Sequence, residues 1–434
     1  MKWQRLLNAS ATVVLLVSAG CNAVATPTSP PLAPATSTPS PAQTETETAP
    51  GPASPTPEPP SLGEPAAPPH YQVGDPIQLD EIHMMNANEG WAISGPYVLV
   101  TTDGGVTWRE ATPPETLPDG ATARAYGAFL DTQTAWVIFS IGKDQQDPQI
   151  ASEATVWRTV DGGQTWTRSA PLLHEAYGDV VWAEFAALDA EEVWLMVRGV
   201  YSAAGRHFRA HLFQSVDAGT TWTPLAGEAD LNWDFTGMVF SDPANGWLTW
   251  QTTGAYASAP PEYAVTNDGG DSWETFELPP PPDTRDFFDQ YEYCEPYQPN
   301  LLSTDSIRML VGCFDYFDPP QQFVSYLYAS DDGGFTWETI LLPDPVLASQ
   351  YTLIYFGLPA SSRHGALLLG REIYSSTDDG RTWEHVKTVN WDGQFSFVDS
   401  LRGWAIASSS EGVALVRTVD GGRTWALIKP VIGP

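Results

Sequence analysis

One octapeptide recurs along the chain and constrains its fold more than any other feature. Each of its seven copies follows the pattern S/T-x-D-x-G-x-T/S-W, as in TTDGGVTW at Thr101–Trp108. Successive aspartates of the pattern are 42 to 64 residues apart, so the repeating unit has about fifty residues. Repeats of this length are typical of propellers and solenoids. The aspartate and tryptophan pairs are Asp103 and Trp108, Asp161 and Trp166, Asp217 and Trp222, Asp268 and Trp273, Asp332 and Trp337, Asp378 and Trp383, and Asp420 and Trp425.

A second landmark shares this period: an Asp or Asn lies five residues before a Trp, as in DTQTAW at Asp131–Trp136. Asp side chains bond to their own backbone in turns and Gly accepts a positive φ, so both landmarks indicate tight turns between strands. In two repeats the aligned segments lack the Trp, namely DSIRML at Asp305–Leu310 and SSRHGA at Ser361–Ala366. We expect the remaining tryptophans to lie in the core; they are Trp91, Trp136, Trp194, Trp247 and Trp404.

Four short strands in each of seven repeats predict an all-β fold, a seven-bladed β-propeller with four-stranded antiparallel blades. A solenoid is the alternative. We expect the octapeptide to be structural, because its carboxylate and hydroxyl can bond to the backbone of one tight hairpin. The propeller is predicted over 73–434, with blades at about 76–115, 116–175, 176–228, 229–281, 282–345, 346–388 and 389–434.

The octapeptides resemble Asp boxes, the BNR repeats of bacterial sialidases, sortilin-type receptors and xyloglucanases. Combined with the second landmark, they make the chain most similar to the photosystem II stability/assembly factor family of seven-bladed propellers, over about Gln78 to Lys429. This resemblance implies that the boxes lie on the face opposite the usual binding mouth. It implies a fold and leaves the function open, because one fold serves many functions.

The N-terminal residues predict export from the cytoplasm. Lys2 and Arg5 precede a short apolar run that ends in SAGC at Ser18–Cys21, as in a signal peptide over 1–21. The sequence around Cys21 resembles a bacterial lipobox, which implies a lipid on that cysteine and attachment to a bacterial membrane. Cleavage after Ala25, giving a secreted protein, is the alternative. Residues 22–72 are rich in Pro, Ser, Thr and Ala and predict a disordered linker.

Charge and cysteine usage narrow the choice of partners and cofactors. The formal net charge of −33 argues against nucleic acid, since phosphate binding needs Lys and Arg surfaces. Cys294 and Cys313 predict a disulfide in an oxidising compartment. His207 and His211 would be about 13 Å apart in a strand, too far to share one metal ion. We therefore predict no cofactor, no metal site and a monomer.

Loop lengths place a candidate binding face on the edge opposite the boxes. Blades 2 to 5 have long segments between their second and third strands, and the segment joining blades 4 and 5 is the longest connector. Aromatic and acidic residues alternate there, which suits stacking on sugars or holding a basic peptide. Packing of the same rings inside the protein is the alternative. The candidates are Phe287, Phe288, Tyr291, Tyr293, Tyr297, Tyr316 and Phe317, with Trp182, Trp233 and Trp391 near the mouth of the central channel.

Two functions are open at this point. The first is a non-catalytic cell-surface lipoprotein that binds a protein or glycan ligand and acts as an assembly scaffold. The second is a sialidase-like exo-glycoside hydrolase, which by resemblance would need three converging arginines, a tyrosine and an acid. The chain has no Arg-Ile-Pro motif, and we assign no catalytic residue. The arginines that could converge on the mouth are Arg124, Arg198, Arg206 and Arg285.

Overall fold

In the computed structural model, the 434-residue chain divides into Met1–Pro59 and Pro60–Pro434, and every residue described below belongs to the second unit. The structure describes residues 63–115, 122–142, 154–172, 180–200, 208–225, 234–251, 260–282, 287–288, 291, 293–314, 323–342, 354–357, 364–369, 371–410 and 412–434. None of these residues lies in an α-helix, and so none forms a helix long and apolar enough to cross a membrane.

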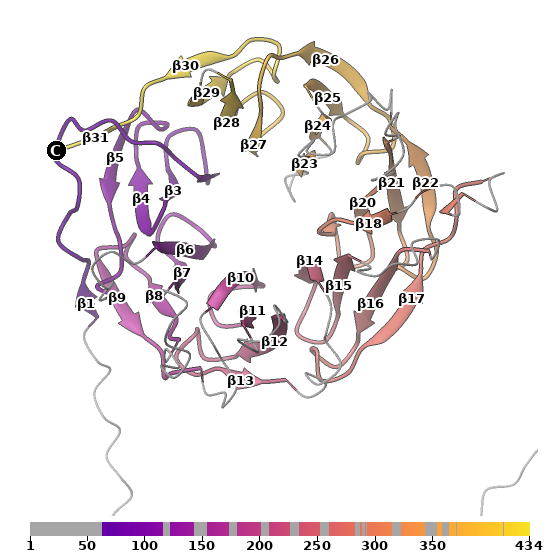
Figure 1. The fold of residues 1–434 in the computed structure, drawn as a ribbon, viewed down its shortest axis with the longest axis horizontal. Helices are drawn as coiled ribbons and strands as arrows, with labels where there is room; N and C mark the ends of the chain where they lie inside the picture. The colour runs from indigo at the N-terminus through magenta and orange to yellow at the C-terminus, as the bar shows by residue number, and fades with distance from the viewer. Residues whose placement is uncertain are drawn as a thin grey trace, which may run out of the picture. The chain divides into compact units, whose positions relative to one another are not determined.

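The described strands form seven small sheets arranged in a ring (Figure 1). Blade 1 consists of β2 (Glu81–Met84), β3 (Gly90–Ser94), β4 (Tyr97–Thr101) and β5 (Thr107–Glu110). Its strands pair in chain order and antiparallel, with the first strand toward the centre of the ring. The other blades repeat this arrangement, which confirms the seven-bladed propeller.

The bounds of the other blades follow in chain order. Blade 2 has β6 (Thr122–Phe129), β7 (Ala135–Gly142), β8 (Trp157–Thr159) and β9 (Thr165–Arg168); blade 3 has β10 (Val180–Ala187), β11 (Val193–Val200), β12 (Phe208–Ser215) and β13 (Thr223–Pro224); blade 4 has β14 (Asp234–Phe240), β15 (Gly246–Gln251), β16 (Glu262–Thr266) and β17 (Glu274–Glu277). Blade 5 has β18 (Tyr293–Pro296), β19 (Asn300–Leu301), β20 (Ile307–Phe314), β21 (Phe323–Ser330) and β22 (Glu338–Leu341); blade 6 has β23 (Ile354–Gly357), β24 (Gly365–Leu369), β25 (Glu372–Ser376) and β26 (Glu384–Thr388); blade 7 has β27 (Asp392–Phe397), β28 (Gly403–Ser409), β29 (Gly412–Thr418) and β30 (Ala426–Ile428).

Each octapeptide is a hydrogen-bonded hairpin, as the first box illustrates. The Asp103 carboxylate accepts the backbone N–H of Thr107 at 2.8 Å on one oxygen and the Thr107 hydroxyl at 2.7 Å on the other. The Thr101 hydroxyl donates to Asp103 at 3.0 Å and accepts the N–H of Gly105, whose φ is +88°. The other six boxes repeat these bonds. The box is therefore a structural fastener.

In blades 2, 3, 4 and 7 the tryptophan on the second strand links the blade to the box of the following blade. In blade 3, for example, the Trp194 indole N–H donates to the carbonyl of Gly269, the residue after the box aspartate of blade 4, at 2.8 Å. The two sequence landmarks are thus the two halves of one contact between blades. The same bond joins Trp136 to Ala218 at 2.9 Å, Trp247 to Gly333 at 3.1 Å and Trp404 to Gly104 at 2.9 Å.

Blades 1 and 5 replace this donor with an arginine. In blade 5, Arg308 takes the tryptophan position and its Nε donates to the carbonyl of Asp379 at 2.8 Å. The alignment that put Leu310 at that position is wrong by two residues, because the turn is closed by Ser303 and not by Asp305. In blade 1, Arg109 donates to Gly162 at 2.7 Å, while Trp91 bonds to a turn of blade 2.

The ring is closed by two short straps (Figure 1). After blade 7, β31 (Val431–Ile432) runs parallel to β5 and adds a fifth strand to blade 1. Before blade 1, β1 (Glu64–Pro65) pairs with β9 at the outer edge of blade 2. The straps also bond to each other, since Gly74 and Asp75 exchange backbone hydrogen bonds with Ile432. Each strap therefore ties one blade to the next.

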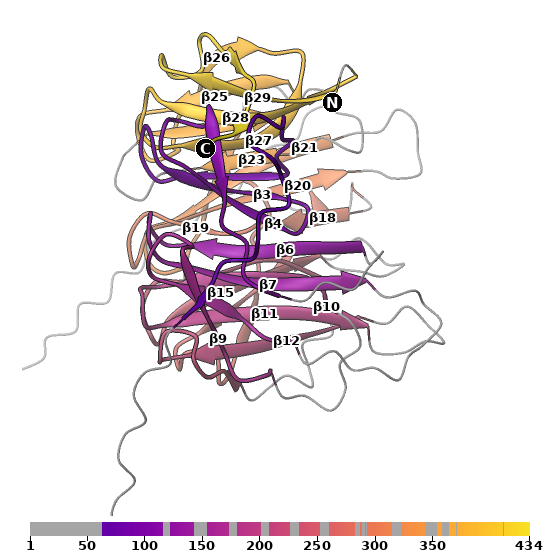
Figure 2. The ribbon, with the colours of Figure 1, turned by 90° about the vertical axis from the view of Figure 1, so that its left-hand side faces the viewer.

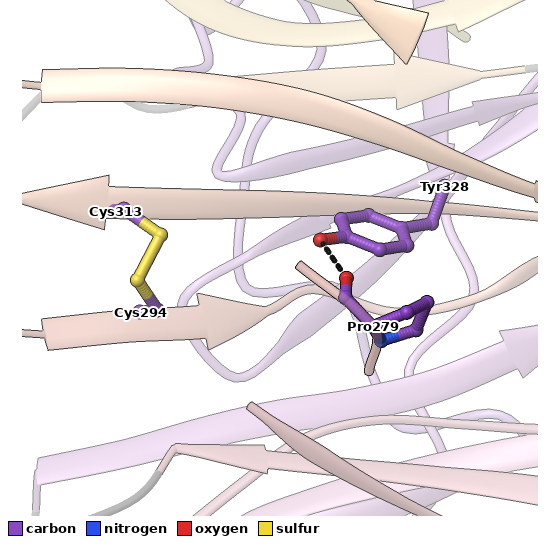
Figure 3. Close-up of a disulfide and its surroundings, with 4 residues drawn as sticks. All are labelled: Pro279, Cys294, Cys313 and Tyr328. Carbon is purple, nitrogen blue, oxygen red and sulfur yellow. Dashed lines mark hydrogen bonds between the residues drawn. A yellow bond between two sulfur atoms is a disulfide. The ribbon is translucent and has the colours of Figure 1, made fainter. Parts of the chain in front are cut away.

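The predicted disulfide is present between Cys294 on β18 and Cys313 on β20, which are directly opposite in the strand register (Figure 3). Near it, the Tyr328 hydroxyl donates to the carbonyl of Pro279 at 2.9 Å, so the connector from blade 4 is fixed to blade 5.

Removing this disulfide should lower the stability of the chain. The bond closes a loop whose ends are 19 residues apart. Replacing both Cys294 and Cys313 with Ala should lower the free energy of unfolding by about 3 kcal/mol, chiefly because the unfolded chain regains freedom. Guanidinium denaturation of the full chain measures this loss. Adding reductant to the double variant should have no effect, and an unchanged denaturation midpoint for that variant would contradict the prediction.

Candidate functional site

Polar and aromatic side chains gather on the first strands of blades 1 to 3 and on the second strand of blade 3. In each blade the first strand ends at the turn beside the box edge, so its opening residues lie at the other edge, as the parallel run of β6 and β10 in Figure 2 shows. Glu81 opens β2, and Arg124 follows close to the start of β6. The edge opposite the boxes therefore carries charged groups near the centre of the ring.

These groups contact one another across the blade boundary. Arg124 forms an ion pair with Glu81 at 3.0 Å, and its guanidinium lies 5.4 Å from the ring centre of Tyr126. In blade 3, the Arg198 guanidinium lies 5.3 Å from the ring centre of Trp182. We name these five residues, Glu81, Arg124, Tyr126, Trp182 and Arg198, the rim cluster.

The charges of the rim cluster act on one another across the boundary between blades 2 and 3. Burial raises the pKa of the Tyr126 phenol; the charges of Arg124 and Arg198 oppose that rise, and the charge of Glu81 adds to it. At Glu81 burial raises the pKa of the carboxyl, but His83 and Arg124 outweigh this effect and hold the pKa below its usual value. The cluster thus combines a carboxylate, two guanidinium groups and two partly exposed rings.

A second carboxyl lies deeper on β10. Glu184 accepts the backbone N–H of Met238, on the first strand of blade 4, at 3.1 Å. Burial raises the pKa of the Glu184 carboxyl to about 7. A carboxyl with a pKa near neutrality can donate or accept a proton, and such groups concentrate at functional sites as well as in structural networks.

The Glu184 carboxyl should make stability depend on pH. Because its folded pKa of about 7 exceeds an unfolded value near 4.3, the folded state binds the extra proton, and stability falls as pH rises from about 4 to 7. Glu184→Gln should therefore leave stability unchanged at pH 4 and raise it at pH 8 by about 1 to 3 kcal/mol. Denaturation of both proteins at pH 4, 6 and 8 measures the difference. An equal effect at every pH would contradict this prediction.

The predicted aromatic residues of blade 5 lie mainly inside the protein. Phe287 and Phe288 are 5% and 4% exposed, and Phe287 packs edge-on against Tyr326 at 5.2 Å. Tyr291 packs against the same core and Tyr297 donates its hydroxyl to Glu295 at 3.0 Å. These rings hold the insertion against its own blade, which is the alternative that the sequence left open. Their role in binding stays a prediction.

The tryptophans predicted near the channel differ in exposure. Trp182 is partly exposed and belongs to the rim cluster. Trp391 is 8% exposed and packs against the box residue Trp425 at 5.4 Å, so it belongs to the core. The remaining candidates lie outside the described residues: Trp233, Tyr316, Phe317, Arg206, Arg285, the side chain of Tyr293 and most of the long loops of blades 2 to 5.

Sequence reasoning missed three residues of this region, namely Glu81, Tyr126 and Glu184. Each lies in an ordinary strand with no motif around it, so only the packing of neighbouring blades brings them together. Of the four arginines proposed to converge, Arg124 and Arg198 lie within the described residues; burial raises the pKa of Tyr126, and the charges of both arginines oppose that rise. Within the described residues no group of three His, Cys, Asp or Glu side chains is placed to hold a metal ion.

Comparisons with known proteins find matches among solved structures alone. No protein-family model and no curated protein matches the chain, whereas 176 chains of solved structures do. One is YCF48 bound to D1 peptide, which is 16% identical with a TM-score of 0.49, over 82% of this chain and 97% of that one. Another is the α-L-arabinofuranosidase Arb93A from Fusarium graminearum, 14% identical with a TM-score of 0.42, over 71% and 95%.

A third similar structure is a puromycin-hydrolyzing peptidase from Mycobacterium tuberculosis, 13% identical with a TM-score of 0.49, over 85% of this chain and 56% of that one. Similarities with TM-scores below 0.5 assign no function to this chain, so its function must be inferred from the residues of the site.

Proposed function

We propose that the protein is a non-catalytic, extracytoplasmic propeller, attached to a membrane through a lipid on Cys21, that binds a protein or glycan ligand at the rim cluster. The observation that carries the proposal is the pairing of two partly exposed rings with two guanidinium groups at the edge opposite the boxes. Tyr126 and Trp182 each lie under a guanidinium, that of Arg124 or of Arg198, and such pairs of a ring and a cation suit ligands that bear carboxylate or carbonyl oxygens.

The charge of the chain supports a polar ligand at this place. The chain has a net charge of −33, whereas the rim cluster holds two guanidinium groups and one carboxylate and so has a local excess of positive charge. In the boxes, in contrast, the carboxylates and hydroxyls are hydrogen-bonded within their own hairpins. A ligand bearing a carboxylate, such as an acidic sugar or an acidic peptide, therefore suits the rim cluster better than the box edge.

The binding test compares the full chain with its Trp182→Ala variant on glycan and peptide arrays. We expect ligands of the wild-type chain to lose at least about five-fold in signal, because a stacked ring contributes about 1 to 3 kcal/mol at such sites. The control variant is Phe335→Ala, whose ring is 76% exposed at the box of blade 5. Equal loss in both variants, or no loss in Trp182→Ala, would remove the rim cluster from the proposal.

The membrane attachment has its own test. A Cys21→Ser chain should leave the membrane fraction.

A sialidase-like hydrolase is the second candidate, favoured by the approach of Arg124 and Arg198 to Tyr126. In that case Tyr126 would act as nucleophile and Glu81 as its base, by resemblance to the tyrosine and glutamate pair of sialidases. Turnover of a fluorogenic sialoside that Tyr126→Phe abolishes would establish this function and overturn the binding proposal. Absence of turnover in the wild-type chain, together with ligand retention, would support the scaffold.

A further inference from the structure

The contact between blades 6 and 7 lacks the donor found at the equivalent contacts. Ala366 on β24 takes the position held by tryptophan in other blades and is 8% exposed. The carbonyl that this donor would meet belongs to Gly421, the residue after the box aspartate of blade 7. Among the described residues no group donates to that oxygen, whereas the carbonyls at this position in the other six boxes each accept an N–H.

The second half of an indole site is also in place. In blade 4, Phe240 ends the first strand and stacks on Trp194 of the preceding blade, with ring centres 3.8 Å apart and planes 5° apart. Phe397 ends the first strand of blade 7 in the same way. Both rings lie over the glycine that opens the next strand, since a Cβ on Gly246 or Gly403 would meet them at 2.5 and 2.7 Å. Phe397 therefore occupies in blade 7 the position that Phe240 occupies in blade 4.

A cavity of about 190 Å³ occupies this contact and is lined by Ala366, Phe397, Leu401 and Gly421 among others. Volume alone does not distinguish it, because grooves of about 390 and 310 Å³ lie at the contacts of blades 1 with 2 and 4 with 5. Those two grooves include Trp91 and Trp247, and their box carbonyls already accept a donor. The cavity beside Ala366 therefore has the ring of Phe397, the carbonyl acceptor of Gly421 and enough space, but no indole of its own.

We propose that this cavity binds the indole ring of a tryptophan in a partner polypeptide. The ring stacks on Phe397 as Trp194 stacks on Phe240, and its N–H donates to the carbonyl of Gly421. Leu401 is 52% exposed at the opening and offers an apolar contact for the residues beside that tryptophan. The acidic charge of the chain favours basic residues around it. This site lies at the box edge and is independent of the rim cluster.

The test titrates the full chain with N-acetyl-5-fluorotryptophan amide and follows its ¹⁹F NMR signal. Wild-type chain should bind the probe, and Ala366→Trp should weaken binding at least about ten-fold because its own indole fills the cavity. A probe methylated on the indole nitrogen should bind about five- to ten-fold more weakly, since it has no donor for Gly421. Phe397→Leu should weaken binding of the probe several-fold, because it removes the ring on which the indole stacks. This variant replaces Ala366→Trp in the test if Ala366→Trp does not fold.

Control measurements separate this proposal from general adhesion and from a small-molecule site. Trp404→Ala should add a second site of the same kind, whose acceptor is Gly104. Equal affinity of wild type and Ala366→Trp, equal affinity of the methylated probe, or no binding to the wild-type chain would overturn the proposal. Binding of free 5-fluoroindole with no binding of a Gly-Trp-Lys peptide would overturn the polypeptide partner.

Discussion

Deleting Val431–Pro434 is expected to lower the free energy of unfolding by about 2 kcal/mol. These residues form the strap that joins blade 7 to blade 1. Val431 donates to the carbonyl of Val106 at 3.2 Å and Gly433 donates to that of Trp108 at 2.9 Å. Without them the outer edge of blade 1 loses a strand and the ring is left open.

The estimate follows from the contacts that the deletion removes. Ile432 exchanges two further backbone bonds with Asp75 and Gly74, at 2.9 and 2.8 Å, and its side chain is 6% exposed. Four backbone bonds at about 1 kcal/mol each and one buried isoleucine at about 2 kcal/mol contribute about 6 kcal/mol. The conformational entropy of four ordered residues, at about 1 kcal/mol each, offsets about 4 kcal/mol of this, which leaves a net loss of about 2 kcal/mol.

The matched control is a shorter deletion of Gly433 and Pro434 alone. It removes one backbone bond and leaves β31, so its cost should be about 1 kcal/mol. Guanidinium denaturation of the full-length chain and of the two shortened chains measures both losses of stability. Equal stability of the two deletions would show that β31 does not close the ring.

The fold could be predicted from the sequence because one device is repeated. Each box carries all its partners within eight residues, so its hairpin is specified locally, and counting boxes counts blades. The strap contacts could not be predicted in this way. The pairing of Val431 with Thr107 joins segments more than three hundred residues apart, and neither segment has a motif.

The candidate site was harder to predict for a related reason. The aromatic residues near Cys294 attracted attention by their density, yet Phe287 and Phe288 are buried, because large rings in an insertion are also what fixes it to its blade. Tyr126 and Glu184 lie in strands whose alternation looks ordinary. Their neighbours come from other blades, so no local pattern marks them.

The acid response of the boxes follows from the same local design. In the last box the hydroxyl and the backbone N–H of Thr424 are the main causes that lower the pKa of Asp420 to about 2. A carboxyl whose pKa is lower in the folded chain than in the unfolded chain stabilises the fold at pH values above its unfolded pKa. This stabilisation is lost as the pH falls through the folded pKa. The boxes therefore keep their charge and their bonds through mildly acidic conditions, unlike the Glu184 carboxyl.

Replacing Arg308 with Ala is expected to lower the free energy of unfolding by about 4 kcal/mol. The side chain is buried, with the residue 1% exposed, and it occupies the tryptophan position of blade 5. Its Nε donates to Asp379, and its Nη1 donates to the carbonyls of Ile307 and Ser330 at 2.8 and 3.0 Å. Removing it leaves buried carbonyls without donors and takes from Asp331 one of its two arginine partners, at 3.1 Å.

Two further variants show which property of Arg308 matters. Arg308→Trp keeps a donor for Asp379 in the geometry of the other blades, so it should cost only about 1 kcal/mol. Arg381→Ala removes the more exposed arginine that also pairs with Asp331 and Glu338, and surface ion pairs contribute less than about 1 kcal/mol. Denaturation midpoints of the full chains should therefore fall far more for Arg308→Ala than for either control. If Arg308→Trp lowers the free energy of unfolding as much as Arg308→Ala does, then the hydrogen bond between blades is not the source of the stability. The charge of the arginine would then be the source.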